Sequence, residues 1–406
     1  MQTPAGQLTF CTNIFPGEDW ETHFTALKAH VPAIKQAVSP SRPMGIGLRL
    51  SNKASLQLSH EDQLHRLLQW LKDTDCYVFT MNGFPYGQFH HSQVKDQVHV
   101  PDWATDARLQ YTLRLFRLLS AMLPEGMHGG VSTAPISYKP WFTGKPEQAA
   151  AVLEKGTWQI ATVIMALHRI HRSTGRVLHL DLEPEADGMI ASTEEFIHWY
   201  ANTLLPVALP LLEEEFSLSA AKAEAVVREH LRICFDVCHC AVGFESIGDA
   251  VSRLTAAGIR IGKWQLSAAL KVHFKGKDPE ALMAELQKFD EPVYLHQVVS
   301  RDKTGFRHFT DLSPAIGDAE ARGADQWRSH FHVPLFISDY GLLGATQQEV
   351  CQAINIQKEG HLCDHLEIET YTWDVLPEAL KLPIGESIIR EIKWVLNQIY
   401  ATTDHE

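Results

Sequence analysis

The sequence is short of cysteine and has no C-x-x-C pair, with seven cysteines among 406 residues. A disulfide scaffold or a zinc-thiolate site needs cysteines in larger or paired groups. Cys234, Cys238 and Cys240 surround His239, and the sequence holds no second cysteine cluster that could complete a structural zinc site. We therefore expect reduced thiols buried as small apolar side chains, with no disulfide and with Cys238 outside any metal coordination.

The chain also lacks an excess of positive charge and any long apolar run. With 36 Lys and Arg against 49 Asp and Glu, its formal charge is −13, whereas duplex nucleic acid is bound through a basic face that displaces counterions. A membrane span needs about 18 consecutive apolar residues, and no such run occurs. The first residues show no basic segment followed by an apolar one. We expect a cytoplasmic protein with no nucleic-acid partner and no direct membrane insertion.

No glycine-rich phosphate loop of the type G-x-G-x-x-G or G-x-x-x-x-G-K-[ST] follows any β-rich run. The β-rich runs alternate with amphipathic stretches such as 61–73 and 106–123, which predicts parallel strands joined by crossover helices. An open doubly wound sheet would usually carry fewer strands and a phosphate loop. We therefore predict an α/β fold, a (β/α)8 TIM barrel. The eight runs begin at Leu8, Gly45, Cys76, Gly129, Val177, Leu231, Ile259 and His365.

One interval, 268–334, breaks this alternation. It holds a helical stretch, two β-rich segments around the turn-like RDKTG sequence, and the apolar segment HFHVPLF. We interpret it as an insertion before the last strand that folds over the barrel mouth as a hairpin, although a further βα unit would also fit. No repeat or linker divides the chain, so residues 1–406 are predicted to form a single TIM-barrel domain.

Acidic residues lie near the ends of the predicted strands. In VLHLDLEPE, period-2 alternation places His179, Asp181 and Glu183 on the face opposite a row of leucines. The leucines suit the surrounding helices, so the polar face must point into the barrel, where buried carboxylates are costly unless they are paired or bound to a cation. In HLEIETYTW the same alternation groups Glu367 with Glu369, and acidic residues disfavour a strand unless a metal or substrate compensates.

Asp236 and His239 in FDVCH form a third group at a strand end. This spacing can bring a carboxylate and an imidazole to one ion, while a helix N-cap aspartate with a surface histidine is an equally good interpretation. Further candidates are Gln265 at the end of the seventh strand and His296, His330 and His332 in the insertion. Each is a weak signal by itself. Oxygen and imidazole groups at successive strand ends together predict a metal site at the carboxyl-end mouth of the barrel.

The order of these groups resembles the metal-binding pattern of xylose-isomerase-like barrels, which include sugar isomerases, epimerases and endonuclease IV. That pattern has Glu from the fifth strand, Asp-x-x-His from the sixth, Gln or His from the seventh and Glu from the eighth. The resemblance implies a divalent metal ion, Mn²⁺ or Zn²⁺ with Mg²⁺ as an alternative. The implied ligands are Glu183, Asp236, Gln265 and Glu369, with His239 as a further ligand or a substrate contact. Since the seventh-strand ligand of the epimerases is usually histidine, His296 or His332 would supply the missing imidazole.

Longer stretches resemble one family in this superfamily, the EboE-type metabolite traffic proteins of a bacterial gene cluster linked with export of secondary-metabolite precursors. The similarity is nearly full-length. It implies a small-molecule metabolite at the metal site and protein partners from the same gene cluster. The matching stretches are CTNIFPGEDW, NGFPYGQFH, VKDQVHVPDW, LHLDLEPE, FDVCHCAVGFE, FHVPLF and HLEIETYTWDVLP.

Polar residues at other strand ends are expected to bind the metabolite. Asn13 and Asn82 end the first and third strands, where amide side chains would hydrogen-bond sugar-like hydroxyls. Tyr86 lies in the turn-rich NGFPYG segment, which would fold over a ligand, although a purely structural turn fits equally well. Glu185, His296 and Glu367 complete the expected substrate-binding residues.

Two functions are compatible with such a site. In a metal-dependent isomerase or epimerase, Glu183 and Glu369 would hold the ion that polarises a carbonyl or hydroxyl, and Glu185, His239 or Glu367 would move a proton. In a metabolite traffic protein, the same mouth would hold or hand over a metabolite without turnover. Nuclease action like that of endonuclease IV is disfavoured by the acidic charge.

Overall fold

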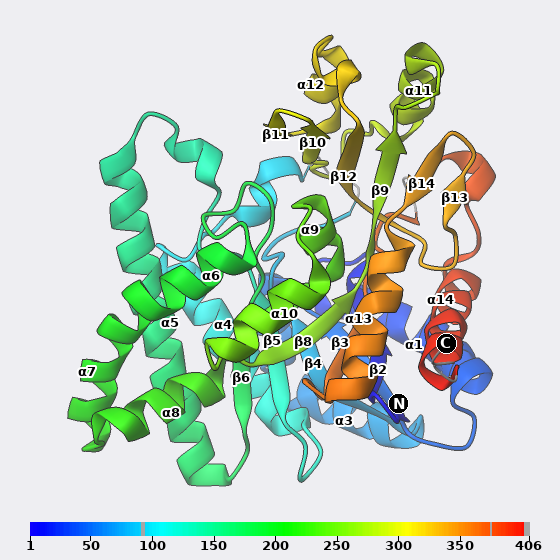
Figure 1. Ribbon diagram of the computed structural model, residues 1–406. Helices are drawn as coiled ribbons and strands as arrows, with labels where there is room; N and C mark the ends of the chain where they lie inside the picture. Colours follow the sequence, from blue (N-terminus) through cyan, green and yellow to red (C-terminus); the bar gives the residue numbers. More distant parts are fainter. Residues whose placement is uncertain (91–93, 374–375, 402–406) are drawn as a thin grey trace.

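Eight parallel strands form a barrel in the computed structural model of the protein, which describes residues 1–90, 94–373 and 376–401 (Figure 1). All eight β-rich runs become neighbouring strands, in the order β2-β15-β8-β7-β6-β5-β4-β3. The predicted TIM barrel with an insertion before the last strand is confirmed. Residues 374 and 375 of the HLEIETYTWDVLP stretch lie outside the described residues. The barrel strands are β2 (Gly6–Phe10), β3 (Met44–Arg49), β4 (Cys76–Asn82), β5 (Gly129–Thr133), β6 (Leu178–Leu182), β7 (Leu231–Asp236), β8 (Ile261–Leu266) and β15 (His365–Ile368); β1 (Gln2–Thr3) pairs antiparallel with β2.

Helices surround the barrel, and many begin at a capping side chain. Asp19, Thr105 and Ser246 each accept a hydrogen bond from the backbone N–H three residues further on, which satisfies a donor that the first helical turn leaves free. None of the described helices combines the length and the apolar character needed to cross a membrane. The helices are α1 (Trp20–Val38), α2 (Asn52–Leu58), α3 (Glu61–Asp73), α4 (Asp106–Met122), α5 (Pro146–Thr174), α6 (Thr193–Trp199), α7 (Leu205–Phe216), α8 (Ala220–His230), α9 (Val237–Val242), α10 (Ile247–Ala256), α11 (Pro279–Leu286), α12 (Leu312–Gly317), α13 (Gln347–Gly360) and α14 (Ile384–Tyr400).

The seam between β2 and β3 closes the barrel with fewer contacts than the others. A single parallel bridge joins Cys11 to Gly47, and the Thr9 hydroxyl donates to the Gly45 carbonyl at 2.9 Å. The barrel interior is crowded here, because a Cβ at Gly47 would lie 1.8 Å from a carboxylate oxygen of Glu367. Glycine on β3 therefore leaves room for an acidic side chain inside the barrel.

A second sheet follows β8 and lies at the carboxyl-end mouth of the barrel (Figure 1). It contains β9 (Ala268–His273), β10 (Val298–Asp302), β11 (Gly305–Phe309), β12 (Gln326–Val333), β13 (Asp339–Tyr340) and β14 (Leu343–Ala345). Its order is β11-β10-β12-β9-β14-β13, and all its pairs are antiparallel. A further βα unit would have given a parallel strand. The sheet continues past Pro334 to Ala345, because β14 pairs with β9 and completes its edge.

The alternation in VLHLDLE is confirmed by the packing of β6. Leu178, Leu180 and Leu182 are fully buried in the core beneath the helices. The alternate residues face the barrel interior, where the His179 Nδ1 and an Asp181 oxygen lie 2.6 Å apart. One hydrophobic cluster includes side chains of both the barrel and the second sheet. The insertion therefore shares a hydrophobic core with the barrel.

Candidate metal centre

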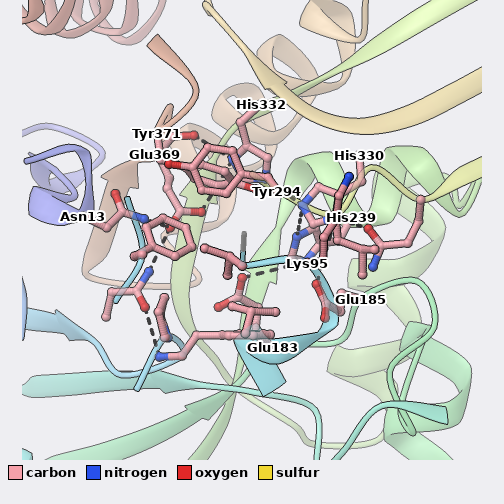
Figure 2. A pocket seen from close by; sticks show the side chains of 18 residues that line it. Asn13, Lys95, Glu183, Glu185, His239, Tyr294, His330, His332, Glu369 and Tyr371 are labelled. Atoms are coloured by element: carbon pink, nitrogen blue, oxygen red, sulfur yellow. Dashed lines mark hydrogen bonds and ion pairs between the residues drawn. The ribbon is translucent and has the colours of Figure 1, made fainter. Parts of the chain in front are cut away.

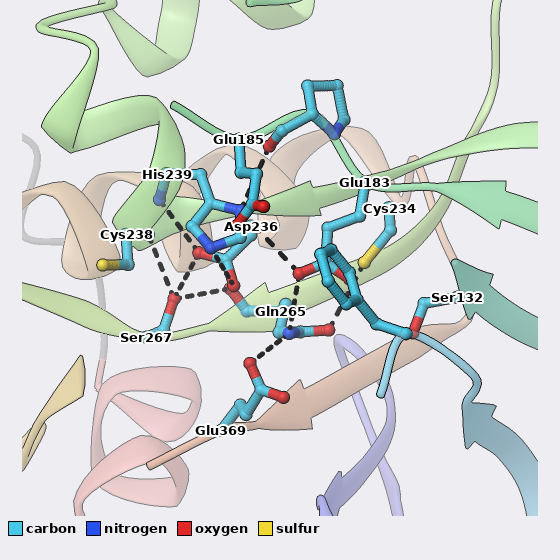
Figure 3. A network of polar contacts seen from close by, with 12 residues as sticks. Ser132, Glu183, Glu185, Cys234, Asp236, Cys238, His239, Gln265, Ser267 and Glu369 are labelled. Carbon is cyan, nitrogen blue, oxygen red and sulfur yellow. Dashed lines mark hydrogen bonds and ion pairs between the residues drawn. The ribbon is translucent and has the colours of Figure 1, made fainter. Parts of the chain in front are cut away.

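Three carboxylates from the ends of three barrel strands meet at the mouth. Glu183 follows β6, Asp236 ends β7 and Glu369 follows β15. One oxygen from each lies within 4.8 Å of the others, and the side chains are at most 4% exposed. Figure 3 shows them grouped around Gln265. The carboxyl ends of parallel strands open at one end of a barrel, which is why residues far apart in the sequence converge here.

Some oxygens of this group are held by hydrogen bonds, while others have no partner. The Asp236 Oδ1 accepts from the His239 backbone N–H at 3.0 Å and from the Ser267 hydroxyl at 2.7 Å. Asp236 thus is the N-cap of α9, as the alternative interpretation of FDVCH required, and its other oxygen stays available. Among the described residues, Asp236 Oδ2 and Glu183 Oε2 are buried without any hydrogen-bond partner. Buried carboxylate oxygens are costly unless a cation or a proton compensates their charge.

Glu369 is oriented by two asparagines from other strands. Its Oε1 accepts from the Asn13 Nδ2 at 2.7 Å and from the Asn82 Nδ2 at 2.8 Å. Burial, followed by the charges of Asp236 and Glu367, raises the pKa of Glu369 well above its usual range. Burial and the charges of Glu369 and Asp236 do the same to the pKa of Glu183. Without a cation, Glu183 and Glu369 therefore hold protons at pH values where isolated glutamate side chains release them.

Gln265 was predicted to be a metal ligand, and its placement in the structure contradicts this. Its side-chain nitrogen donates to Glu183 at 3.2 Å and also to Glu369. Its oxygen faces away and accepts from the Cys234 thiol at 3.3 Å. An amide nitrogen has no lone pair to offer a cation, so Gln265 in this orientation positions two ligands rather than acting as one.

Three histidines next to the carboxylates direct their Nε2 atoms toward one another. The Nε2 of His330 lies 3.1 Å from that of His239 and 3.2 Å from that of His332 (Figure 2). Each Nδ1 faces an acceptor. His239 faces the Pro184 carbonyl at 3.1 Å, His332 the Glu369 carbonyl at 2.8 Å, and His330 the side-chain oxygen of Gln297 at 2.7 Å.

These contacts fix the tautomers of the three rings. A carbonyl oxygen can only accept, so the Nδ1 atoms carry the hydrogens and the Nε2 atoms carry lone pairs. Burial, then the neighbouring histidines, lowers the pKa of His330 well below its usual range. Its Nε2 is therefore not readily protonated to form a hydrogen bond with the other two Nε2 atoms. The Asp236 Oδ2 lies 3.9 Å from the Nε2 of His239 and 4.0 Å from that of His332. This cluster has the donor types that borderline divalent metals prefer.

A cavity lies over these groups. Asn13, Asn82, Glu185 and the three histidines line it, as do Glu183 and Glu369. Its other wall is aromatic: the ring centroids of Phe89, Tyr294 and Tyr371 lie 4.9–5.2 Å apart. Such a cavity suits a small molecule with one polar edge and one apolar face.

Two residues predicted to bind substrate lie outside this cavity. Tyr86 packs edge-on against Tyr111, with ring centroids 5.0 Å apart, on the far side of the loop that Pro85 presents to the cavity. His296 is 1% exposed and stacks on Phe331 at 4.7 Å. Neither residue lines the cavity: Tyr86 is half-buried in a different pocket, and His296 is buried against Phe331.

Glu367 also lies away from the cavity, one layer deeper in the barrel. Its Oε2 is 2.5 Å from the Nζ of Lys263, and neither side chain is exposed. Although burial opposes it, the negative charge of Glu367 raises the pKa of Lys263. Glu367 is therefore neutralised by a protein cation and is not placed to bind substrate or move its proton.

Several residues of the site were not among the predicted ones, including Phe89 and Tyr371 of the aromatic wall. Tyr294 and Gln297 come from the segment before β10, and His99 comes from the loop before α4. His99 is fully buried, and its Nε2 is 2.9 Å from the Oε1 of Glu185. Loops carry no periodicity, so the sequence held no signal for these residues beyond their residue type.

All seven cysteines fall within the described residues and are free thiols, six of them buried. Burial raises the pKa of Cys238 well above its usual range, and the charge of Asp236 adds to this. A thiol is a metal ligand in its ionised form. The expectation that Cys238 does not coordinate metal stays a prediction, although its Sγ lies near His330 and His332.

Comparisons with known proteins found solved structures of similar fold but no matching family. No family model and no curated protein matches the sequence. One similar solved structure is the probable 3-DHS dehydratase AsbF, involved in petrobactin synthesis, from Bacillus anthracis, with 14% identity, coverage of 96% of this chain and 99% of that one, and a TM-score of 0.43. Another is the IOLI protein with a binding zinc atom, with 12% identity, 98% and 100% coverage and a TM-score of 0.44. A third is a xylose isomerase-like TIM barrel protein from Mycobacterium smegmatis in complex with magnesium, with 10% identity, 98% coverage of each chain and a TM-score of 0.48.

Proposed function

We propose that the barrel mouth binds a divalent metal ion through Glu183, Asp236 and Glu369, with His332 as the imidazole ligand. The observation that supports this most is the convergence of these three buried carboxylates, two of which, Glu183 and Asp236, each keep an oxygen without a hydrogen-bond partner among the described residues. The Nδ1 of His332 donates to a backbone carbonyl, so its Nε2 lone pair is free to ligate. Oxygen and imidazole donors together favour Zn²⁺ or Mn²⁺ over Mg²⁺.

The ligand of this centre is a small hydroxylated metabolite. Asn13 uses its amide nitrogen on Glu369 and keeps a buried oxygen without a partner among the described residues. That oxygen lies on a residue that lines the cavity and would accept a hydroxyl proton. The apolar face of a sugar-like ring would pack on the Phe89, Tyr294 and Tyr371 rings.

The residues around the cavity support turnover by proton transfer, as in an isomerase or epimerase. A bound ion would polarise a carbonyl or hydroxyl oxygen of the metabolite. Glu185 lines the cavity and is the group we assign to move the proton, with the buried His99 2.9 Å from its carboxylate to hold it in place. His239 is tied to Pro184 through Nδ1 and presents Nε2 at the cavity, as a ligand or a second proton carrier.

Metabolite carriage is the second candidate function. It is favoured by the long stretches that resemble EboE-type metabolite traffic proteins, which would place the protein in a precursor export pathway with partners from its gene cluster. Carriage uses the same ion and cavity. A carrier would retain a small molecule or co-purify with those partner proteins, and it would show no turnover when supplied with ketoses and aldoses.

Metal content tests the shared part of both functions. Protein purified without added metal is expected to contain at least one equivalent of a divalent ion by elemental analysis. Glu369→Gln should reduce that content, since an anionic ligand is lost. Glu215→Gln is the matched control. Glu215 lies on α7 and forms a surface ion pair with Arg169 of α5, so this variant should retain the metal. If wild-type protein dialysed against Zn²⁺ or Mn²⁺ retains none, the proposal is wrong.

A further inference from the structure

A second group of histidines lies far from the mouth, between α5 and α8. His168 and His171 are one turn apart near the end of α5, and His230 is the last residue of α8. One ring nitrogen from each lies within 4.8 Å of the others. These helix ends lead into β6 and β7, so the group sits at the amino-terminal end of the barrel, opposite the second sheet (Figure 1).

The His230 ring is fixed with a lone pair directed into this group. The side chain is fully buried, and its Nδ1 lies 2.7 Å from the backbone carbonyl of Leu178. The carbonyl can only accept, so Nδ1 carries the hydrogen and Nε2 carries the lone pair. Among the described residues, His230 Nε2 and His168 Nδ1 are buried without a hydrogen-bond partner. Buried imidazole nitrogens without a partner are costly in a purely packed cluster.

The three rings pack around one another, and a carboxylate lies beside them. The centroid of the buried His230 ring is 5.9 Å from that of His168 and 5.9 Å from that of His171. A carboxylate oxygen of Glu229 lies 3.4 Å from the Nδ1 of His171. Arg172 also lies near this group, since its charge contributes to the lowered pKa of His168. Its positive charge would repel a cation bound here.

We propose that His168, His171 and His230, with Glu229 as the fourth donor, form a site for a borderline divalent cation of the Zn²⁺ type. Three imidazoles and one carboxylate match the tetrahedral N/O coordination of zinc, whereas Mg²⁺ prefers an all-oxygen shell. Zinc–nitrogen bonds of about 2.0–2.1 Å require the ligand nitrogens to approach to about 3.4 Å. His171 and Glu229 are 33% and 31% exposed, so their side chains are free to close that distance.

The ion would join the end of α5 to the end of α8 at the start of two barrel strands. Its role is therefore structural, because the metabolite cavity lies at the other end of the barrel and none of these four residues lines it. Binding to the native state alone stabilises a protein in proportion to the logarithm of ion concentration over Kd. Zinc should thus raise the thermal unfolding temperature independently of the ion at the mouth.

The test is zinc titration of chelator-treated protein in the Glu369→Gln background, which weakens the mouth site. His171→Gln is the variant of choice because this histidine is partly exposed and the fold should tolerate the change; His168→Gln is the second. Each is expected to bind one equivalent fewer than the background protein, or to bind it about tenfold or more weakly, and to lose part of the zinc-induced rise in unfolding temperature.

His65→Gln, at an exposed histidine of α3, is the control and should change neither quantity. Co²⁺ in place of Zn²⁺ should give the visible absorption of a tetrahedral imidazole-ligated ion, and His171→Gln should remove it. The proposal is overturned if both histidine variants match the background in zinc equivalents, affinity and unfolding temperature, because the three rings are then a packed cluster. Each histidine variant is compared with the Glu369→Gln protein itself. Failure of the mouth site to bind an ion would therefore not change the interpretation of this comparison.

Discussion

Glu367 and Glu369 are two residues apart in the eighth barrel strand and its end, and both are buried, yet the protein compensates their charges differently. Glu367 lies deeper and contacts Lys263 at 2.5 Å. Glu369 lies at the mouth beside Glu183 and Asp236, with amides as its hydrogen-bond donors. The deeper carboxylate has a protein cation on one oxygen, while its Oε1 has no hydrogen-bond partner among the described residues. In the part of the chain that the structure describes, the mouth carboxylates have no protein cation beside them, and a divalent ion would compensate their charge. This difference distinguishes the acid with a structural role from the acid with a proposed metal-binding role on the same strand.

The largest effect is expected from breaking the deeper pair. Lys263→Met leaves Glu367 buried without its cation, which should cost about 3–5 kcal/mol of unfolding free energy, measured by urea denaturation of chelator-treated protein. Lys288→Met removes a surface pair with Glu285 and should cost no more than about 1 kcal/mol. Equal losses in the two variants would show that Glu367 does not depend on Lys263.

A smaller effect should follow from filling the mouth. Zn²⁺ or Mn²⁺ at 100 times its Kd should raise the unfolding free energy of chelator-treated wild type by about 2.7 kcal/mol. In a His171→Gln background, which weakens the proposed histidine site between α5 and α8, adding Asp236→Asn should lose most of that gain, since it removes a carboxylate ligand of the mouth ion. Lys288→Met is again the control and should gain as much as wild type. A gain that persists in Asp236→Asn would place the stabilising ion elsewhere.

Glu391 shows a third way to accommodate a buried acid, which is to keep its proton. It accepts from the Thr370 hydroxyl at 2.7 Å and from the Leu335 N–H at 3.1 Å, and burial raises its pKa to about 8. The native state therefore holds a proton that the unfolded chain releases near pH 4.5. The stability from this group is complete below that pH and is lost as pH rises toward 8, by about 1.4 kcal/mol per pH unit.

Glu391→Gln should remove that slope. Urea denaturation at several values between pH 5 and 8, with chelator present, should show wild type losing stability relative to Glu391→Gln as pH rises. Parallel curves for the two proteins would mean that Glu391 is ionised in the native state.

The smallest effect is expected from the mouth carboxylates themselves in the absence of metal. Glu369→Gln keeps the side-chain size and removes a buried group that ionises as pH rises, so the chelator-treated variant should be more stable than wild type by about 1 kcal/mol near neutral pH. The raised pKa of Glu369 gives the sign, because its stabilising proton is lost as pH rises. A less stable apo variant would show that Asn13 and Asn82 stabilise the charged form by more than the neighbouring acids destabilise it.

The strand pattern was predictable because a closed barrel imposes a strict period of two on each strand. His179, Asp181 and Glu183 followed that rule, and Glu183, Asp236 and Glu369 converge because they end parallel strands. Lys263 stands two residues before Gln265 in IGKWQL, so the same rule could have shown that a cation faces Glu367. Its omission led to the wrong assignment of Glu367 to substrate binding.

The rest of the site could not be predicted in the same way. Tyr86 and His296 lie in segments whose direction depends on tertiary packing, and both are covered by aromatic neighbours. His330 and Gln297 reach the mouth through an antiparallel sheet, where no rule brings strand ends together. The amide orientation of Gln265 depends on the Cys234 thiol, a contact with no trace in the spacing of residues.

The most direct test of the account is anomalous diffraction at the zinc edge from crystals of wild-type protein grown with Zn²⁺. The account predicts a peak between the carboxylates of Glu183, Asp236 and Glu369, within about 2.0–2.2 Å of their oxygens, and no peak beside Glu367 and Lys263. A mouth without anomalous density at saturating Zn²⁺ would contradict it, because the uncompensated carboxylates would then be balanced by protons alone.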